Sequence, residues 1–346
     1  MSFAVTATLL KMGVWLGVIL NVTPVMLWLE RRGGALIQDR PGPNRVGPLG
    51  LFQALADVVK FLCKEDVTPS EVDRPLYLLA PIIALIPSLT VFIVIPFGPT
   101  VTVGGNEVPL VVTTADTGVL LLLALSSLGV YSLVLAGYSS NNKYSLLGAV
   151  RASAQMISYE LALTLAVVAV LVPVGTFRLD AVVEAQQGTW LGFIPAWNVF
   201  PQILGFLVFL IAAFAETNRL PFDLPEAESE LVGGYNTEYS AMRFALFFMG
   251  EYQSMAVLSA LAATLYFGGW YLPGLDYTGT WWVVAAKGLS VLVAKMGLFL
   301  LLYVWVRWTF PRFRFDQLMR LGWKVLLPVA LLNFVLVAAM TIGGWL

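Results

Sequence analysis

The stretch from 200 to 268 reads FPQILGFLVFLIAAFAETNRLPFDLPEAESELVGGYNTEYSAMRFALFFMGEYQSMAVLSALAATLYFG, and it joins two apolar runs through an acid-rich loop. A bilayer core about 30 Å thick needs roughly 20 apolar residues per spanning helix. The runs at 200–217 and 244–268 have about that length. The stretch therefore predicts two membrane-spanning helices that meet at one membrane edge, where a negatively charged loop connects them.

The same pattern extends along the whole chain. Of the 346 residues, 59% are hydrophobic and only 12% are charged, and the mean hydropathy is +0.82, whereas a soluble domain has about 25% charged residues. We predict an all-α integral membrane protein, a single polytopic membrane domain over 1–346. Its transmembrane helices, about eight in number, are expected at about 9–29, 76–96, 117–137, 154–174, 200–217, 244–268, 281–305 and 324–344.

The composition excludes several kinds of site. The single cysteine, Cys63, rules out an internal disulfide and any four-thiolate metal site, and the absence of histidine rules out haem or metal ligation by that residue. Proton transfer must then rely on Asp, Glu, Lys, Tyr and water. The net charge of −1 gives no reason to expect nucleic acid as a partner. The N-terminal apolar run lacks the features of a cleaved signal and is expected to be a retained span.

The distribution of basic residues predicts the orientation. The loops after the second, fourth and sixth spans contain Arg178 alone, whereas the loops after the odd-numbered spans contain all the other basic residues outside the spans. Basic loops stay in the cytoplasm, so both termini are expected on the outer side, in a bacterial plasma membrane or a mitochondrial inner membrane. The cytoplasmic segments are then a loop at 30–75, an acidic loop at 217–243 and a basic loop at 306–323.

Two smaller elements are predicted outside the spans. The residues 49–64 place apolar side chains on one helical face and charged ones on the other, which is typical of an amphipathic helix lying in the membrane interface. This helix is either a simple anchor or the wall of an entrance through which an apolar molecule passes from lipid to the polar loop before it. In the outer loop at 98–112, alternating residues around Gly104-Gly105-Asn106 predict a small β-hairpin.

Several ionisable residues lie inside predicted spans: Glu160, Glu216, Glu251, Lys287 and Lys295. Each costs roughly 2.5–3.5 kcal/mol at the centre of a helix, so a function is expected. One interpretation is a relay of protons, in which clustered carboxylates that repel one another exchange protons. The other is a buried ion pair of Lys295 that locks two helices together. The acidic loop, likewise, is either the mouth of this relay or a surface that docks a basic partner.

Four motifs resemble the H subunit of proton-translocating NADH:quinone oxidoreductase, respiratory complex I, whose mitochondrial form is called subunit 1. They occur in the order expected for that family and span nearly the whole chain. The motifs are Glu30-Arg31 followed by IQDRPGPNRVGPLGLFQALADVVKFLCKED at 37–66, AETNRLPFDLPEAESELVGGYNTEYS at 215–240, FALFFMGEY at 244–252 and PRFRFDQLMRLGWK at 311–324.

The resemblance implies a non-redox subunit that forms the membrane side of the quinone chamber, while flavin and iron–sulfur clusters belong to partner subunits of the peripheral arm. The positions that match the chamber and its entrance are Arg31, Gln38, Arg40, Asp57, Phe222, Phe248 and Arg312. Those assigned to the proton path are Glu160, Glu216, Asp223, Glu226, Glu228, Glu230, Glu251 and Lys295. Some members of the family have a histidine in the YNTEYS motif, at the position where this chain has Asn236. A mechanism that needs that histidine is therefore not expected here.

Other functions remain open at this point. A matching subunit of a membrane hydrogenase or an F420-type dehydrogenase would share the motifs and differ in the electron-input subunits that copurify. A stand-alone ion-coupled transporter would use the same buried charges, but no internal repeat is evident. A pure membrane scaffold would not need charges inside its spans.

Overall fold

The computed structural model describes residues 3–190, 194–224 and 231–345. Seven helices in these ranges are long and apolar enough to cross a membrane, and α7 is a shorter apolar helix, in agreement with the predicted all-α membrane fold. The long helices are α1 (Phe3–Ile37), α3 (Arg74–Thr90, continued by the 3₁₀ turn Val91–Val94), α4 (Gly118–Ser139), α5 (Lys143–Val174), α9 (Ala241–Tyr266), α10 (Trp281–Thr309) and α11 (Phe315–Leu321), which runs through a π-helical turn (Gly322–Leu326) into α12 (Leu327–Ile342). Helix α7 covers Ile203–Glu216.

Two spans begin or end well beyond their predicted limits. Helix α1 continues to Ile37 because Arg31 and Arg32 do not interrupt a helix, whereas Pro41 does. Helix α5 begins at Lys143, where the side chain of Asn142 caps it by accepting from the Tyr144 amide. Hydropathy marks only the part of a helix that lies in lipid, so it misses these polar extensions.

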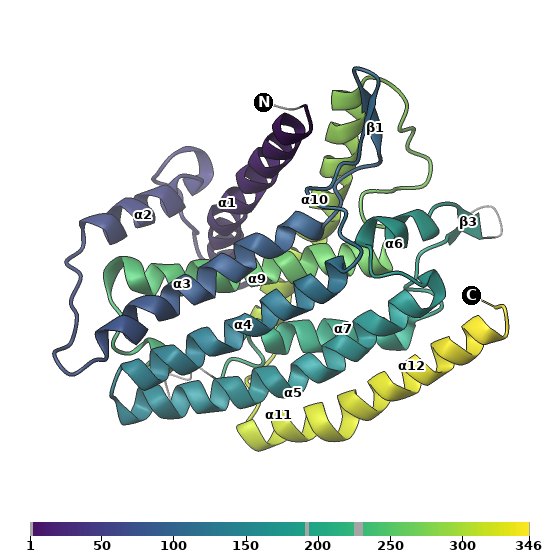
Figure 1. The fold of residues 1–346 in the computed structure, drawn as a ribbon. Coiled ribbons are helices and arrows are strands. Elements are labelled where there is room, and N and C mark those ends of the chain that lie inside the picture. Colours follow the sequence, from purple (N-terminus) through teal and green to yellow (C-terminus); the bar gives the residue numbers. More distant parts are fainter. Residues whose placement is uncertain (1–2, 191–193, 225–230, 346) are drawn as a thin grey trace.

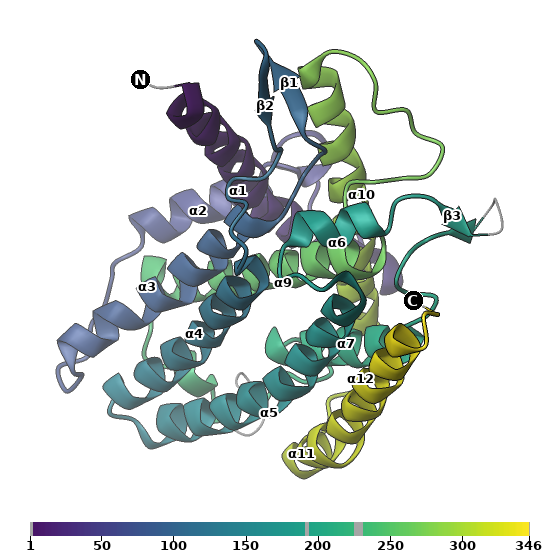
Figure 2. The same cartoon turned by 45° about the vertical axis from the view of Figure 1, so that its right-hand side comes forward.

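The helices form a bundle in which neighbours in sequence are mostly neighbours in space. Helix α4 packs between α3 and α5, and α5 also packs against α7 and α12. Helix α9 contacts α3, α7 and α10, which places it near the centre of the bundle, and α1 packs against α9 and α10 (Figures 1 and 2). The largest hydrophobic cluster runs through these contacts.

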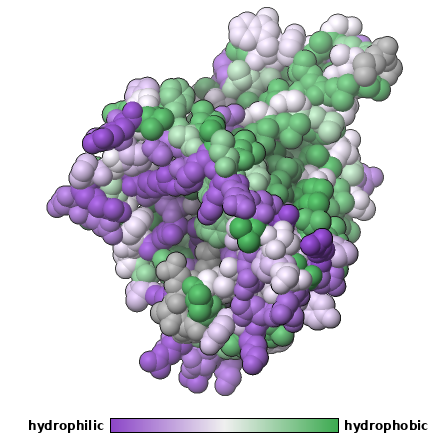
Figure 3. All heavy atoms as spheres, turned by 90° about the vertical axis from the view of Figure 1, so that its left-hand side faces the viewer, coloured by the Kyte–Doolittle hydropathy of each residue, from purple (hydrophilic) through white to green (hydrophobic). Residues whose placement is uncertain are grey.

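The predicted amphipathic helix is α2 (Gln53–Cys63), which follows a 3₁₀ turn at Pro48–Gly50. It lies against α1 and α9, and only Ala54 is buried, while Leu55, Val59 and Leu62 are exposed. Seen from the side on which α2 and the α4–α5 turn lie, hydrophilic residues gather across the left, middle and lower parts of the surface, while a hydrophobic area covers the upper right (Figure 3). This face collects the polar loops between the helices.

The predicted β-hairpin is also present. Strands β1 (Val101–Val103) and β2 (Asn106–Val108) pair antiparallel around Gly104 and Gly105, whose positive φ angles suit a tight turn. The hairpin lies beside the start of α10 (Figure 2). The short helix α6 (Leu179–Ala185) and a second small sheet, β3 (Thr189–Trp190) with β4 (Ile194–Pro195), were not predicted.

Glycines allow some of these elements to approach closely. A Cβ on Gly288 of α10 would lie 2.6 Å from the carbonyl oxygen of Phe97 and 2.9 Å from the Cα of Gly98. A Cβ on Gly297 of the same helix would have no heavy atom within 4 Å. The segment before the hairpin therefore packs directly on the backbone of α10 at Gly288.

These two glycines form a matched pair for a stability test. We expect Gly288→Ala to destabilise the protein by about 1–3 kcal/mol, because the added methyl group overlaps backbone atoms. Gly297→Ala should be neutral or stabilising by up to about 1 kcal/mol, because alanine favours a helix. Thermal unfolding of the two purified variants measures the difference, and equal unfolding temperatures would contradict the close contact.

Candidate functional site

An apolar pocket of about 380 Å³ lies between α1, α2 and α9. One charged pair stands in its wall, with an Nη1 of Arg31 2.6 Å from Oδ2 of Asp57. Gln53 donates to Oδ1 of Asp57 at 3.4 Å, and the ammonium of Lys60 lies 3.7 Å from the same atom. An apolar cavity with a few fixed polar groups is typical of a site for a ligand with an apolar body and a polar head. The lining residues include Pro24, Leu27, Leu55, Phe61, Phe248 and Tyr252.

The residues predicted for the quinone chamber fall into three places. Arg31, Asp57 and Phe248 line the pocket just described. Gln38 and Arg40 lie beyond the end of α1 and are exposed.

Phe222 and Arg312 meet in a second cluster. The buried ring of Phe222 packs 5.6 Å from Phe313 and 5.7 Å from Tyr159, measured between ring centroids. Arg312 pairs with Asp223, with an Nη2–Oδ2 distance of 3.0 Å. This cluster joins the loop after α7 to the basic segment before α11.

Two predicted proton-path carboxylates line a common cavity. Glu216 at the end of α7 and Glu251 of α9 both face a cavity of about 50 Å³. A second cavity of about 50 Å³ shares Glu216 and Ser254 with the first and extends between α3, α4 and α9. Each is large enough for a water molecule, which occupies about 30 Å³ in the liquid. Only 8% of the Glu216 surface is exposed, and its Oε2 has no hydrogen-bond partner within the described part of the chain.

Glu251 is held by two groups from the loop that follows α7. The hydroxyl of Tyr235 donates to Oε1 at 2.9 Å, and an Nη2 of Arg219 lies 3.4 Å from Oε2. Arg219 is 6% exposed, so the ion pair is almost fully buried. Separating a buried pair by removing one partner costs several kcal/mol, because the other charge is left without compensation.

Arg219 also connects this cavity to the apolar pocket. Its guanidinium carbon lies 4.4 Å from the ring centre of Tyr252, a pocket residue. The Tyr252 hydroxyl donates to Oε2 of Glu30 at 2.6 Å, and Glu30 forms an ion pair with Arg307 of α10. A continuous series of polar contacts therefore runs from the pocket, through Tyr252 and Arg219, to Glu251.

The other residues predicted for the proton path, where the structure describes them, do not take part in the contacts between Tyr252, Arg219 and Glu251. Glu160 is partly buried on α5, a helix that packs against α7, but it does not line the Glu216–Glu251 cavity. Lys295 of α10 donates instead to three backbone carbonyls, those of Phe267, Gly269 and Tyr271, at 2.6–2.8 Å. It thus binds the chain just after the C-terminal end of α9, whereas Glu251 lies near the middle of that helix. Glu226, Glu228 and Glu230 lie outside the described residues.

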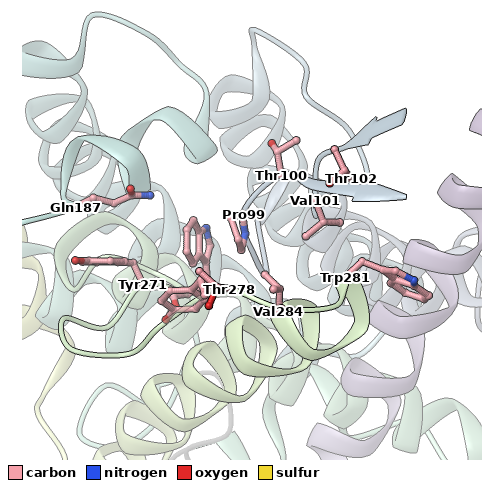
Figure 4. Close-up of a pocket in the computed structure, with 12 residues that line it drawn as sticks. Pro99, Thr100, Val101, Thr102, Gln187, Tyr271, Thr278, Trp281 and Val284 are labelled. Atoms are coloured by element: carbon pink, nitrogen blue, oxygen red, sulfur yellow. The ribbon is translucent and has the colours of Figure 1, made fainter. Parts of the chain in front are cut away.

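A larger cavity of about 400 Å³ lies on the side of the β-hairpin (Figure 4). Its walls come from β1, the start of α10 and the loop after α9, and include Tyr271, Thr278 and Trp281. The described lining contains no Asp, Glu, Lys or Arg side chain; its titratable groups are the hydroxyls of Tyr271 and Tyr277. The cavity that Glu216 and Glu251 line is a separate one, beside the first half of α9.

Sequence reasoning missed some members of the site. Arg219 was visible as the single base among residues 216–240, but its burial against Glu251 and Tyr252 follows only from the fold. The roles of Tyr235 and Tyr252 had no sequence signal. Lys11 of α1 was identifiable as a charge within an apolar run; it donates to the carbonyls of Pro109 and Val111 after the hairpin.

Within the described residues, no group of three or more Asp, Glu or Cys side chains is arranged to hold a metal ion.

Comparison with known proteins identifies the family. Residues 10–338 match the family model described as NADH dehydrogenase. The chain belongs to this family. The NADH-quinone oxidoreductase H subunit of Thermomicrobium roseum is 49% identical over 334 residues, which cover 96% of this chain and 95% of that protein. Subunit 8 of the Rhodothermus marinus enzyme is 50% identical over 91% of each chain, and the H subunit of the Protochlamydia amoebophila enzyme is 48% identical over 92% of each.

The family membership confirms the resemblance predicted from the four motifs, including AETNRLPFDLPEAESELVGGYNTEYS, which contains Glu216 and Arg219. The relatives are named as subunits of an oxidoreductase assembly. The buried ion pair between Arg219 and Glu251 is therefore interpreted as part of a membrane protein of the NADH dehydrogenase family.

The strength of that ion pair can be measured with a double-mutant cycle. We expect Arg219→Leu to lower stability by about 3–5 kcal/mol, because Glu251 loses its cation inside the protein. Adding Glu251→Gln to that variant should restore part of the loss, with an interaction energy of about 0.5–3 kcal/mol. Thermal unfolding of the wild type, both single variants and the double variant gives the value. Additive effects would contradict a direct interaction.

Proposed function

We propose that this chain is the H subunit of a proton-translocating NADH:quinone oxidoreductase, that it forms the membrane side of the quinone-binding chamber, and that it couples quinone reduction to proton translocation. The names of its relatives support the first part. The proposed coupling rests on the contacts of Arg219 with Tyr252, which lines the apolar pocket, and with Glu251, which lines the cavity shared with Glu216 (the carboxylate cavity).

The pocket suits the shape and chemistry of a quinone such as ubiquinone. An apolar tail can pass from lipid along α2, whose exposed leucine and valine side chains continue the apolar lining. The head group then meets the Arg31–Asp57 pair, which offers hydrogen-bond donors to a quinone carbonyl. Gln38, Arg40, Phe222 and Arg312 complete the chamber together with the quinone-site subunits of the peripheral arm.

Reduction of the quinone adds two electrons and two protons, and the pocket carries extra negative charge between the arrival of the electrons and the uptake of the protons. In this proposal, negative charge in the pocket attracts Arg219 through Tyr252 and weakens its interaction with Glu251. The Glu251 carboxylate then takes up a proton, which passes to Glu216 across the shared cavity and on to Glu160. Asp223, Glu226, Glu228 and Glu230 form the acidic entrance of this path. Lys295 remains a predicted member whose contacts lie at the far end of α9.

The chain acts as a non-redox subunit of the translocase in this proposal. It binds no cofactor itself, and quinone is a substrate; the electrons come from flavin and iron–sulfur clusters in partner subunits. Its partners are the other membrane-arm subunits, the quinone-site subunits of the peripheral arm and lipid. The loops at 30–75, 217–243 and 306–323 face the cytoplasm, and both termini face the outer side of a bacterial plasma membrane or its mitochondrial counterpart.

The quinone pocket is tested by removing one charge of its polar pair. Asp57→Asn in the intact enzyme should raise the KM for a short-chain quinone about three- to tenfold, because Arg31 loses its charged partner and changes orientation. Glu65→Gln, an exposed acid just beyond α2, is the control. Steady-state kinetics with membranes that contain the assembled enzyme measure the effect, and an unchanged KM for Asp57→Asn would contradict the proposed position of the quinone.

The proton path is tested by neutralising its buried carboxylates. Glu251→Gln and Glu216→Gln should each reduce quinone-linked turnover and proton pumping by about tenfold or more, because an amide cannot carry a proton between sites. Glu107→Gln, on the exposed strand β2, is expected to behave as the wild type. Pumping in sealed vesicles, measured beside the level of assembled enzyme, provides the readout. Full pumping in either buried variant would remove that residue from the path.

A further inference from the structure

We infer that Gln155 of α5 is a positioning residue of the coupling site, whose amide holds the turn that carries Glu216 and Arg219 between the quinone pocket and the carboxylate cavity. This inference rests on the proposed function, since it concerns the geometry of the same site. Gln155 is fully buried and touches neither the pocket nor the cavity. Its contacts go instead to the turn at 215–222.

A single nitrogen of Gln155 closes this turn. Its Nε2 donates to the carbonyl of Ala215 at 2.7 Å and to the carbonyl of Phe222 at 2.9 Å. It also lies 3.3 Å from Oδ1 of Asn218. The Ala215 carbonyl belongs to the last turn of α7, where it also accepts from the backbone amide of Asn218 at 3.4 Å. One amide therefore fixes both the end of α7 and the start of the following segment.

The turn has a conformation that needs such support. Asn218 has a φ of +50°, in the left-handed region that residues other than glycine seldom adopt. Its side chain is fixed by Gln155 and by the neighbouring Met156, whose sulfur accepts from Nδ2 at 3.6 Å. Two consecutive residues of α5 thus hold Asn218, and Arg219 follows directly.

The consequence is that Gln155 sets the position of Arg219 relative to Glu251. Glu216 and Arg219 both lie in the turn, so a change in the turn moves both charges together. The charged groups around the turn come from several elements. Glu216 and Arg219 belong to it, Glu251 of α9 pairs with Arg219, and Asp223, which follows the turn, pairs with Arg312 of the segment before α11. On α5 itself, Glu160 lies five residues after Gln155. A neutral donor binds the turn without adding to these charges.

The substitution Gln155→Glu tests this role because the side chain keeps its length and shape. An ionised carboxylate donates no hydrogen bond, whereas a protonated one donates a single bond. In the intact enzyme we expect quinone-linked turnover at pH 8 to be about tenfold below wild type, since small displacements of catalytic groups have effects of this order. Part of the loss should be recovered at pH 6, because the buried position, surrounded by carbonyl oxygens, disfavours the ionised carboxylate and favours its protonation as the pH falls.

Gln186 provides a matched control. It is also fully buried and donates to two backbone carbonyls, those of Val182 and Thr264, but it binds the chain at the other end of α9. Gln186→Glu removes equivalent bonds, so it should lower stability without giving turnover a new dependence on pH. A wild-type pH profile for Gln155→Glu, or the same profile for both variants, would overturn the inference.

A second variant covers the case in which Gln155→Glu does not assemble. Asn218→Gly retains the positive φ and removes only the side-chain contacts to Gln155 and Met156. It should lower the ratio of protons pumped to quinone reduced by about twofold; an unchanged ratio would overturn the inference. Glu251→Gln, measured beside these variants, separates the two ideas. If it pumps normally, the proposed path fails and the inference fails with it, whereas impaired pumping there with normal Gln155 and Asn218 variants overturns only the role of Gln155.

Discussion

The buried ion pair between Arg219 and Glu251 is the interaction on which the rest of the site depends. Arg219 is the one base among residues 216–240, and its guanidinium contacts both the carboxylate of Glu251 and the ring of Tyr252. Removing two charges from water is costly, and a buried pair repays that cost only with good geometry and further hydrogen bonds. Tyr235 supplies one such bond to Glu251. A pair under these constraints responds strongly to a change of charge nearby, which is what coupling to quinone reduction requires.

A second constraint is that irregular backbone inside a membrane must find hydrogen-bond partners within the protein. This chain meets the constraint repeatedly with buried amides and lysines. Gln155 binds the turn after α7, Gln186 and Lys295 bind the segments around the end of α9, and Lys11 binds the segment after the hairpin. A buried charge or amide in such a helix therefore has two possible roles, support of the backbone or proton transfer. The acceptors that it contacts distinguish the two.

The sequence predicted the spans, the amphipathic helix and the hairpin because hydropathy and periodicity are local properties. It also singled out the acids Glu216 and Glu251, since charges in apolar runs are conspicuous; their role in proton transfer stays a prediction. It did not predict that Phe222 and Arg312 would meet away from the Arg31–Asp57 pair, because that separation depends on how distant loops pack. The position of Lys295 was equally hidden, since depth in a span says nothing about which carbonyls a lysine reaches. Contacts between elements far apart in sequence are set by packing, which a single sequence does not reveal.

The most direct test of the central claim is a redox-induced infrared difference spectrum of the intact enzyme in the carboxyl region. If quinone reduction in the pocket reaches Glu251 through Arg219, reduction should change the carboxyl signal, and the change should disappear in Glu251→Gln while Glu107→Gln retains it. A spectrum without a carboxyl change, or one that is identical in Glu251→Gln, would contradict the connection between the pocket and the carboxylate cavity.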